Sequence, residues 1–380
     1  MKSIIIEDVQ VVCHAGDSLE SIREALLTDT VPPMETECVG GVAVPVARVS
    51  VPLRQPSPEE FATRTNALIL HCLDKIAPSL YDVAPERLGV VMGSSNAGIE
   101  EFHQSFNDEA VTPADWARLE PGNVAHFVAH CTGAKGPAYT ISTACSSAAK
   151  ALASAARLLE SGVCDAVIAG GGDALCRFAL EGFHALHLID SRRCTPYTLD
   201  GGGINHGEGA AIFVLTRRQA KAGDIILSGY GETADAHHIT TPEPDGKQAA
   251  RAMRLALQMA DLTPGDIDYI NMHGTGTDAC DLMEMNSLAA VFGKSCPPCS
   301  STKPYTGHCL GAAGAVEAAI CIALLRAQSE KLPLSVPEAV PAGFEHINFS
   351  VTAARPVTHC LSNSFAFGGN NISLILSRHA

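Results

Sequence analysis

Four residues of the sequence have the types and settings that nucleophilic catalysis requires: one cysteine, two histidines and one lysine. Cys145 lies in STACSSAAKALASAARLL, where an apolar run gives way to an alanine-rich helical pattern. At a helix start, unpaired backbone N–H groups and the positive end of the dipole favour a thiolate and can form part of an oxyanion hole. This position predicts a thiol pKa lowered from about 8.5 toward 7. Taken alone, the position fits a buried packing cysteine equally well.

The two histidines also stand where predicted strands hand over to loops or helices. His273, in YINMHGTGT, ends a predicted strand and is followed by glycines, which allow the backbone to approach a ligand closely. His308 precedes a second alanine-rich helix, with Lys303 five positions upstream. The carboxyl ends of parallel strands share one crevice in α/β proteins. Although a single histidine is usually structural, Cys145, His273 and His308 together predict a catalytic cluster.

The elements that would position this cluster alternate between β-branched apolar runs and helical patterns, which is typical of an α/β fold with buried sheets. Strands are expected at 3–12, 87–95, 138–144, 165–172, 210–216, 224–232, 266–274, 297–303, 347–353 and 372–378. Helices are expected at 18–27, 59–76, 146–162, 246–262, 281–293 and 311–328.

The two halves of the chain repeat the same order of features. Each begins with a strand, carries reactive residues at strand ends, and closes with a glycine-rich segment and a strand (GINHGEGAAIFVLT and FAFGGNNISLILS). This repeat predicts an internal duplication joined near Arg217 to Gly223. The expected domains are therefore residues 1–217, with the cysteine, and 218–380, with both histidines.

Four segments carry a resemblance to a known family. STACSSA, HGTGTDACDLME, STKPYTGHCLGAAGAVEA and NSFAFGGNN resemble, in this order, the hallmark segments of β-ketoacyl-[acyl carrier protein] synthases of the elongating Cys-His-His branch. The resemblance runs from about Arg87 to the end of the sequence. It implies the thiolase fold, with five layers α-β-α-β-α built from two pseudo-duplicated halves, and an acyltransferase that usually dimerises.

The resemblance also implies a role for each reactive residue. Cys145 would take an acyl chain from a phosphopantetheine thioester. His273 and His308 would bind the malonyl thioester carbonyl and promote decarboxylation, and the carbanion would attack the acyl-cysteine to give a chain two carbons longer. The backbone N–H groups of Cys145 and Phe365 would form the oxyanion hole.

Three other matched acidic residues and Lys303 would support the cysteine and the two histidines. Lys303 would act electrostatically, held by Glu317 across the histidine loop. Asp281 and Glu284 match acidic positions of the family that support the site. A pair of first-turn carboxylates favoured by the helix dipole is an equal alternative for them.

A further group matches positions that handle the substrate arm. Thr275 and Thr277 would hydrogen-bond the pantetheine chain. Phe365 would also be a gate beside the cysteine, and Gly368 and Gly369 would let its loop move.

Composition restricts the partners. The net charge of −15 excludes generic nucleic-acid binding, which needs a basic surface. The fourteen cysteines indicate reduced thiols in a cytoplasmic protein, and CPPC at 296–299 lacks the second ligand pair of a zinc site. We expect no metal, no resident cofactor and no membrane span. The phosphopantetheine arm would arrive on acyl carrier protein.

Two departures from the family pattern point to a specialised member. The opening segment IEDVQVVCHAGDS keeps only Gly16 of a usually glycine-rich start. Relatives commonly have carrier-docking arginines where Thr195 and Gly201 stand, and Arg192 and Arg193 could substitute. The sequence therefore resembles ketosynthases of polyene or polyketide-like pathways, working as a homodimer or as a heterodimer with a chain-length-factor-like subunit.

Two other functions remain open at this stage. A non-catalytic chain-length-factor-like subunit would shape the tunnel of a partner ketosynthase, but such subunits lack the nucleophilic cysteine. A thiolase-fold enzyme using coenzyme A thioesters would be favoured if those substrates reacted as well as carrier-bound ones.

Overall fold

The computed structural model of the protein describes residues 2–28, 30–107, 111–198, 201–334 and 342–380. Its main sheet is built from β1 (Lys2–Cys13), β4 (Leu88–Gly93), β5 (Ala138–Ile141), β6 (Ala166–Asp173), β8 (Gly209–Gln219), β9 (Ile225–Ala234), β10 (Tyr269–Asn271), β11 (Cys299–Ser300), β12 (His359–Ala366) and β13 (Asn370–Arg378). These strands lie in the order β11-β10-β12-β13-β9-β1-β8-β6-β4-β5. A small second sheet contains β2 (Glu35–Val39), β3 (Val42–Ala47) and β7 (His206–Gly207).

The main sheet repeats one topology twice. In each half, counting outward from the centre, the strands occur in the chain order first, fifth, fourth, second, third: β1-β8-β6-β4-β5 and β9-β13-β12-β10-β11. The two halves meet where β1 and β9 pair antiparallel over Ile5 and Ile6. The predicted pseudo-duplication is therefore confirmed, while the domain division at residue 217 stays a prediction. The outer three strands of each half run parallel, so their carboxyl ends share one edge.

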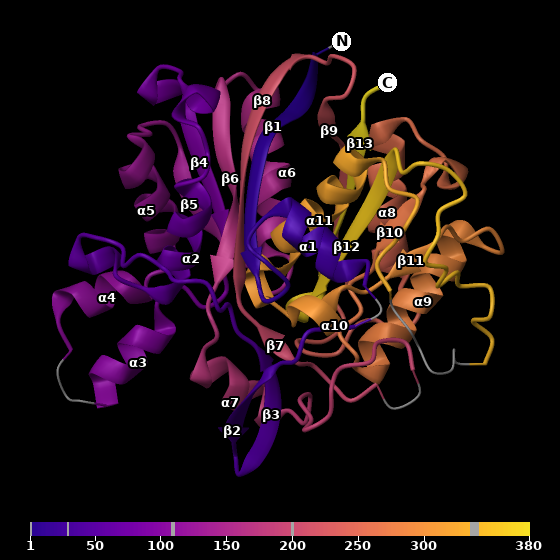
Figure 1. Ribbon diagram of the computed structural model, residues 1–380, viewed down its shortest axis with the longest axis horizontal. Helices are drawn as coiled ribbons and strands as arrows, with labels where there is room; N and C mark the ends of the chain where they lie inside the picture. The colour runs from indigo at the N-terminus through magenta and orange to yellow at the C-terminus, as the bar shows by residue number, and fades with distance from the viewer. Residues whose placement is uncertain (1, 29, 108–110, 199–200, 335–341) are drawn as a thin grey trace.

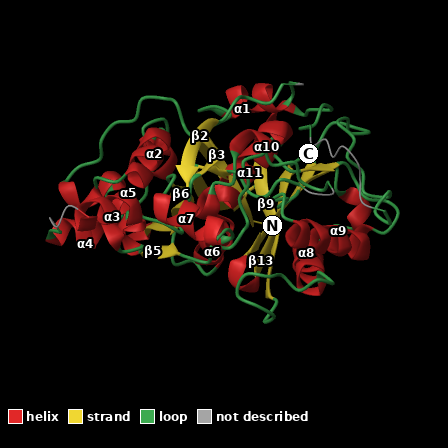
Figure 2. Ribbon diagram, turned by 90° about the horizontal axis from the view of Figure 1, so that it is seen from below, coloured by secondary structure: helices red, strands yellow, loops and turns green. Residues whose placement is uncertain are grey.

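Helices form the other layers (Figures 1 and 2). The α-helices are α1 (Leu19–Leu26), α2 (Arg64–Leu73), α3 (Ile99–Asn107), α4 (Pro113–Leu119), α5 (Gly122–Thr132), α6 (Ser147–Glu160), α7 (Arg177–Ala185), α8 (Lys247–Ala260), α9 (Asp278–Phe292), α10 (Lys303–Thr306) and α11 (Ala313–Ala327). Short 3₁₀ turns lie at Glu59–Phe61, Pro78–Tyr81, Pro85–Arg87, Pro264–Asp266, Leu310–Ala312 and Phe367–Gly369. Helices α6 and α11 pack between the two halves of the sheet, with α2 and α5 outside one half and α8 and α9 outside the other.

Small residues allow the two central helices to approach each other closely. Helices α6 and α11 are alanine-rich and almost wholly buried. A Cβ atom added to Gly314 would lie 2.7 Å from the Cβ of Ala149, so any larger side chain would push the helices apart. Residues Leu310–Ala327 are apolar and long enough to span a membrane by composition, but 89% of them are buried inside the protein, as in a core helix.

Some expected elements are wrong. Residues 347–353 alternate like a strand, but the chain there forms local turns, in which the Asn348 and Ser350 side chains accept hydrogen bonds from nearby backbone N–H groups. Such local bonds compete with strand pairing. In the main sheet, the strand between β10 and β13 is instead β12. The helix expected from residue 59 begins only at Arg64, where the Thr63 side chain caps it.

Candidate active site

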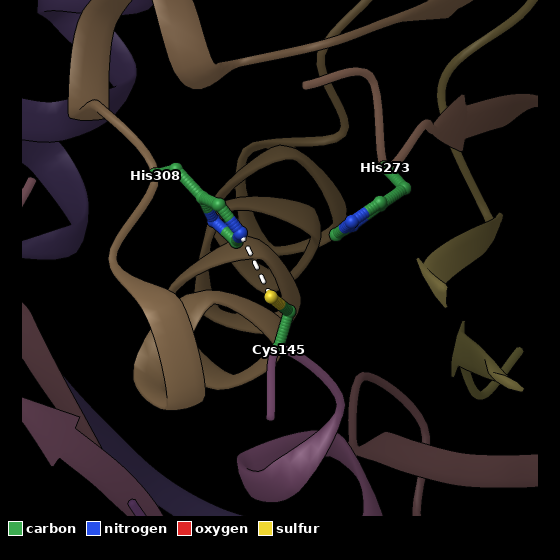
Figure 3. A group of neighbouring side chains, drawn as sticks. All are labelled: Cys145, His273 and His308. Carbon is green, nitrogen blue, oxygen red and sulfur yellow. Dashed lines mark hydrogen bonds between the residues drawn. The ribbon is translucent and has the colours of Figure 1, made fainter. Parts of the chain in front are cut away.

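Cys145 lies in the turn between β5 and helix α6. The helix begins two residues later at Ser147, whose backbone N–H donates to the carbonyl of Ala144 (3.1 Å). Ala144 has a φ of 51°, in the left-handed region that is costly for a non-glycine residue. This tight turn presents the cysteine side chain toward the ends of the second-half strands. Its Sγ atom lies 3.0 Å from Nε2 of His308 (Figure 3).

His308 is held from both sides through its backbone. Its N–H donates to the carbonyl of Asn205 (2.7 Å), and its carbonyl accepts from the N–H of Gly207 (3.0 Å). The segment that follows is fixed by Asp173, whose buried carboxylate accepts from the N–H of Gly311 (2.7 Å). The position of the imidazole is therefore set by the fold.

His273 completes the cluster from the end of β10. Its ring centroid lies 5.5 Å from that of His308, at a steep angle, and Figure 3 shows both rings directed toward Cys145. One donor atom from each of the three residues lies within 4.8 Å of the others. The fold thus brings together the three residues that the sequence predicts. Such a donor set could also hold a metal ion, and the expectation of no metal stays a prediction.

Glu284 in helix α9 holds the loop that carries His273. One of its carboxylate oxygens accepts from the N–H of His273 (2.9 Å) and the side chain of Asn363 (3.1 Å). The other accepts from the N–H of Gly274 (2.9 Å) and the hydroxyl of Tyr197 (2.8 Å). Both oxygens therefore accept two hydrogen bonds each.

Asp281 serves the next part of the same loop. It accepts from the N–H groups of Tyr197 (2.7 Å) and Gly276 (3.2 Å). Burial raises the pKa of Asp281 to about 7 and also raises that of Glu284. Because both carboxylates are buried and saturated with donors, positioning of the loop accounts for them better than an interaction with the helix dipole. A side chain at Gly274 would collide with the Tyr197 hydroxyl, at 2.4 Å from an added Cβ.

Lys303 and Glu317 form a buried ion pair beside the histidines. Each side chain is only 2% exposed, and the ammonium group donates both to the Glu317 carboxylate and to the carbonyl of His273. Burial raises the pKa of Glu317 to about 7 despite the neighbouring lysine. The lysine therefore places a positive charge next to the cluster without contacting Cys145.

The resting cysteine is a thiol, contrary to the expectation from the helix start. Burial raises the pKa of Cys145 to about 12, although the charge of Lys303 acts in the opposite direction. The side chain is enclosed, so a thiolate there loses the water that would stabilise it. This loss of solvation outweighs the partial charge at the end of the helix.

Both histidines are neutral at rest. Burial, and then the charge of Lys303, hold the pKa of His273 and of His308 well below the usual range. A neutral imidazole has one unprotonated nitrogen. With the proton on Nδ1, Nε2 of His308 accepts the Cys145 S–H hydrogen bond and can receive its proton.

The residues expected to handle the substrate arm lie around two adjoining cavities. The larger cavity has a volume of about 440 Å³, and Thr277 is one of its lining residues. Thr275 is buried and does not line this cavity, but its hydroxyl lies 3.1 Å from that of Thr277. Phe365 and both Gly368 and Gly369 line the smaller cavity. Phe365 lies within β12, and its ring centroid is 6.3 Å from that of His273.

Three residues important to this arrangement were missed from the sequence. Phe367 lines both cavities and its ring stacks on Phe183 (5.3 Å, 14°), whereas Phe365 lines only the smaller of the two. It and Asn363 lie inside the quoted NSFAFGGNN, so their motif was available as a signal. The third missed residue is Asp173, which supports the segment after His308. Its only signal in the sequence is that a single polar residue ends a buried strand.

Changing Glu284 to glutamine is expected to lower the free energy of unfolding by about 1–3 kcal/mol, because an amide would face N–H donors on a buried site. The loop of His273 would shift with it, so acyl transfer should fall as well. Thermal or urea unfolding measures the first effect. Glu181→Gln, which removes only an exposed pair with Arg177, is the matched control and should cost less than about 0.5 kcal/mol. Equal losses for both variants would contradict the positioning role.

Comparison with known proteins agrees with this geometry. Residues 75–221 match the family model for the β-ketoacyl synthase N-terminal domain, and residues 225–334 match that for the C-terminal domain. The 3-oxoacyl-[acyl-carrier-protein] synthase 2 of Staphylococcus aureus (strain N315) is 33% identical over 318 residues, which cover 78% of this chain and 76% of that protein.

Solved structures extend the similarity to the whole fold. A chain in the complex of the ketosynthase ApeO with its chain length factor ApeC from Xenorhabdus doucetiae superposes with a TM-score of 0.90 at 35% identity, covering all of this chain and 98% of that one. A β-ketoacyl synthase from Burkholderia phymatum STM815 gives a TM-score of 0.86 at 28% identity over the full length of both. With the thiolase-like architecture and the Cys-His-His cluster both in place, the chain belongs to the β-ketoacyl synthase family of acyl-transferring condensing enzymes.

Proposed function

We propose that the protein condenses a Cys145-bound acyl chain with a malonyl group on acyl carrier protein, extending the chain by two carbons. The observation that carries this proposal is the 3.0 Å contact between Cys145 Sγ and a neutral His308 in an enclosed site. No resident cofactor is needed, because the phosphopantetheine arm comes with the carrier.

Acyl transfer to the enzyme comes first. His308 Nε2 takes the thiol proton as Cys145 Sγ attacks the carbonyl carbon of the incoming thioester. The Cys145–acyl bond forms, the bond to the pantetheine sulfur breaks, and that sulfur leaves with the proton. Backbone N–H groups of Cys145 and Phe365 would stabilise the oxyanion; in other enzymes one such donor contributes roughly 3–4 kcal/mol.

Condensation follows at the same place. The malonyl carbon–carboxylate bond breaks, CO₂ leaves, and the electron pair forms an enolate whose oxygen lies between His273 and His308. The enolate carbon attacks the acyl carbonyl, and the carbon–sulfur bond to Cys145 breaks. The Cys145 thiolate then takes up one proton from the solvent by way of His308, and the 3-oxoacyl chain leaves on the carrier. Lys303 positions the His273 backbone and contributes its charge.

The larger cavity is the proposed channel for the pantetheine arm. Its lining includes Thr277, Gly276 and Phe367 together with residues 186–190 and 201–203. Arg192 lines this cavity, is half-exposed and pairs with Asp190 (2.6 Å), so it is available to an acidic carrier whose arm enters there. Arg193 is directed elsewhere: its guanidinium donates to the carbonyls of Pro32 (2.5 Å) and Pro304 (2.9 Å). Of the two substitutes suggested by the sequence, Arg192 is therefore the one we propose.

A second ketosynthase-fold subunit is the proposed protein partner, in a specialised polyene or polyketide-like pathway of the cytoplasm. The similar chain from Xenorhabdus doucetiae was solved in a complex of a ketosynthase with its chain length factor. Helices α3 and α4 expose an aromatic cluster in which Phe106 is 63% and Trp116 is 59% accessible, both in contact with Phe102. Exposed apolar patches of this kind mark interfaces. Strand β5, at the edge of the main sheet, offers unpaired backbone groups as well.

Intact-mass measurement tests the reaction. The purified protein is incubated with a medium-chain acyl carrier protein and then with malonyl carrier protein, beside acyl-coenzyme A. We expect acyl mass on Cys145, then its discharge as a 3-oxoacyl product two carbons longer. Acylation only with a co-purified subunit would indicate an obligate heterodimer. No acylation under either condition would contradict the enzyme function and favour a tunnel-shaping subunit.

The acylation rate is expected to stay constant from pH 6 to 8. The pKa of His308 lies well below the usual value near 6.5, so the imidazole remains unprotonated and able to accept a proton over this whole range. Protonation would remove the base only at lower pH. Stopped acylation reactions at half-unit intervals measure this profile. A rate that drops about tenfold per unit below pH 6.5 would show that His308 has an ordinary pKa.

A further inference from the structure

One buried histidine beside the site has no part in the steps above. His206 is 1% exposed, and its Nε2 atom has no hydrogen-bond partner among the residues that the structure describes. Leaving a buried polar nitrogen unpaired costs about 1–3 kcal/mol. Since native proteins rarely keep such groups without reason, the atom is a candidate for contact with a bound molecule.

His206 is the direct neighbour of His308. The two residues form a parallel β-bridge, with the backbone bonds of Asn205 and Gly207 to His308 on either side. Residues paired in this way lie about 5 Å apart with side chains on the same face. Because His308 contacts Cys145, His206 is separated from the nucleophile by this one histidine.

The other neighbours of His206 are aromatic. Its ring meets the Phe183 ring edge-on (4.7 Å between centroids, 84°), and Phe183 in turn stacks on Phe367, which lines both cavities. Burial among these groups lowers the pKa of His206 to about 4, so the imidazole is neutral at pH 7. A neutral imidazole offers one donor and one acceptor.

We propose that His206 is a specificity-determining residue, whose imidazole hydrogen-bonds to a carbonyl or hydroxyl oxygen on the acyl chain a few carbons from the Cys145 thioester. The site then prefers oxygenated chains to saturated chains of the same length. The inference rests on the proposed acylation of Cys145. A saturated chain leaves the nitrogen unpaired, and sites built for a hydrogen bond discriminate strongly against analogues that lack it.

The test compares two substrates of equal length, the hexanoyl and 5-oxohexanoyl thioesters of pantetheine, by rates of acyl transfer to Cys145 in the full chain. Wild-type protein should favour the oxo chain by about tenfold or more. His206→Met should bring the ratio close to one. His206→Asn, whose amide both donates and accepts, should keep most of the preference. His14→Met is the matched control, because His14 also has a buried, unpartnered Nε2 but bonds to Arg48.

The outcomes separate this inference from the proposed function. Acylation by both chains with the same ratio in wild type and His206→Met would overturn the role of His206 and leave the enzyme function intact. Equal slowing of both chains by Met and Asn, with folding preserved in circular dichroism, would assign His206 to packing and overturn the inference too. No acylation by either chain would overturn both. If His206→Met does not fold, a wild-type ratio near one is still decisive against the inference.

Discussion

Cys145→Ala should abolish acyl transfer to the protein and reduce condensation by about 10⁴-fold or more, as removal of a catalytic nucleophile does in other covalent enzymes. The variant removes the sulfur that is hydrogen-bonded to His308, so no thioester can form at that position. Because His273 and His308 remain in place, slow release of CO₂ from malonyl carrier protein should persist. Intact mass measures the first effect and CO₂ release the second.

Cys131→Ala provides the control for this variant. Cys131 is an exposed thiol on helix α5, and its removal should leave acylation unchanged. A Cys145→Ala protein that still gains acyl mass would show that another thiol is the acceptor. The same result would leave the Cys145–His308 contact as a packing feature and contradict the proposed mechanism.

Lys303→Met should lower the free energy of unfolding by about 3–5 kcal/mol, because it leaves the Glu317 carboxylate buried without its cation. It also removes the hydrogen bond to the His273 carbonyl. In the fraction that folds, the loss of the positive charge would raise the pKa of both histidines, while burial, the larger cause, still holds it below the usual range. Acylation should then begin to fall at a higher pH than in the wild type. Urea unfolding and the pH profile measure the two effects.

The double variant Lys303→Met/Glu317→Leu distinguishes an ion-pair effect from general damage. With both charges removed, unfolding free energy should recover by more than about 1 kcal/mol relative to Lys303→Met alone, while activity should not return. Lys135→Met is the control, since its pair with Glu86 is exposed and spans 4.0 Å. It should change stability by less than about 1 kcal/mol. A double variant no more stable than the single one would contradict the buried-pair argument.

The sequence by itself determined which groups are the candidates for the chemistry. Cys145, His273 and His308 each stand where a strand meets a glycine- or alanine-rich segment, and this local pattern is readable because strand ends in parallel sheets share an edge. The repeated order of elements along the chain was also readable, because hydrophobic periodicity is a local property of the sequence. The large-scale fold and the cluster therefore followed from short segments read in order.

The tertiary structure alone decided the electrostatics and the supporting contacts. A helix start argued for a thiolate at Cys145, yet the depth of burial, which depends on every packed layer, raises its pKa to about 12. Asp173 and His206 gained their places beside His308 through pairings between distant segments. Residues 347–353 alternate like a strand but form, in the described part of the chain, only a single bridge between Thr352 and Lys331, and the Asn348 side chain accepts a hydrogen bond from the backbone of Ser350. Local sequence patterns determine which reactive side chains are present and whether a segment forms a helix or a strand. The burial of a side chain, the charges near it and the pairing of its backbone depend on residues that are distant in the sequence.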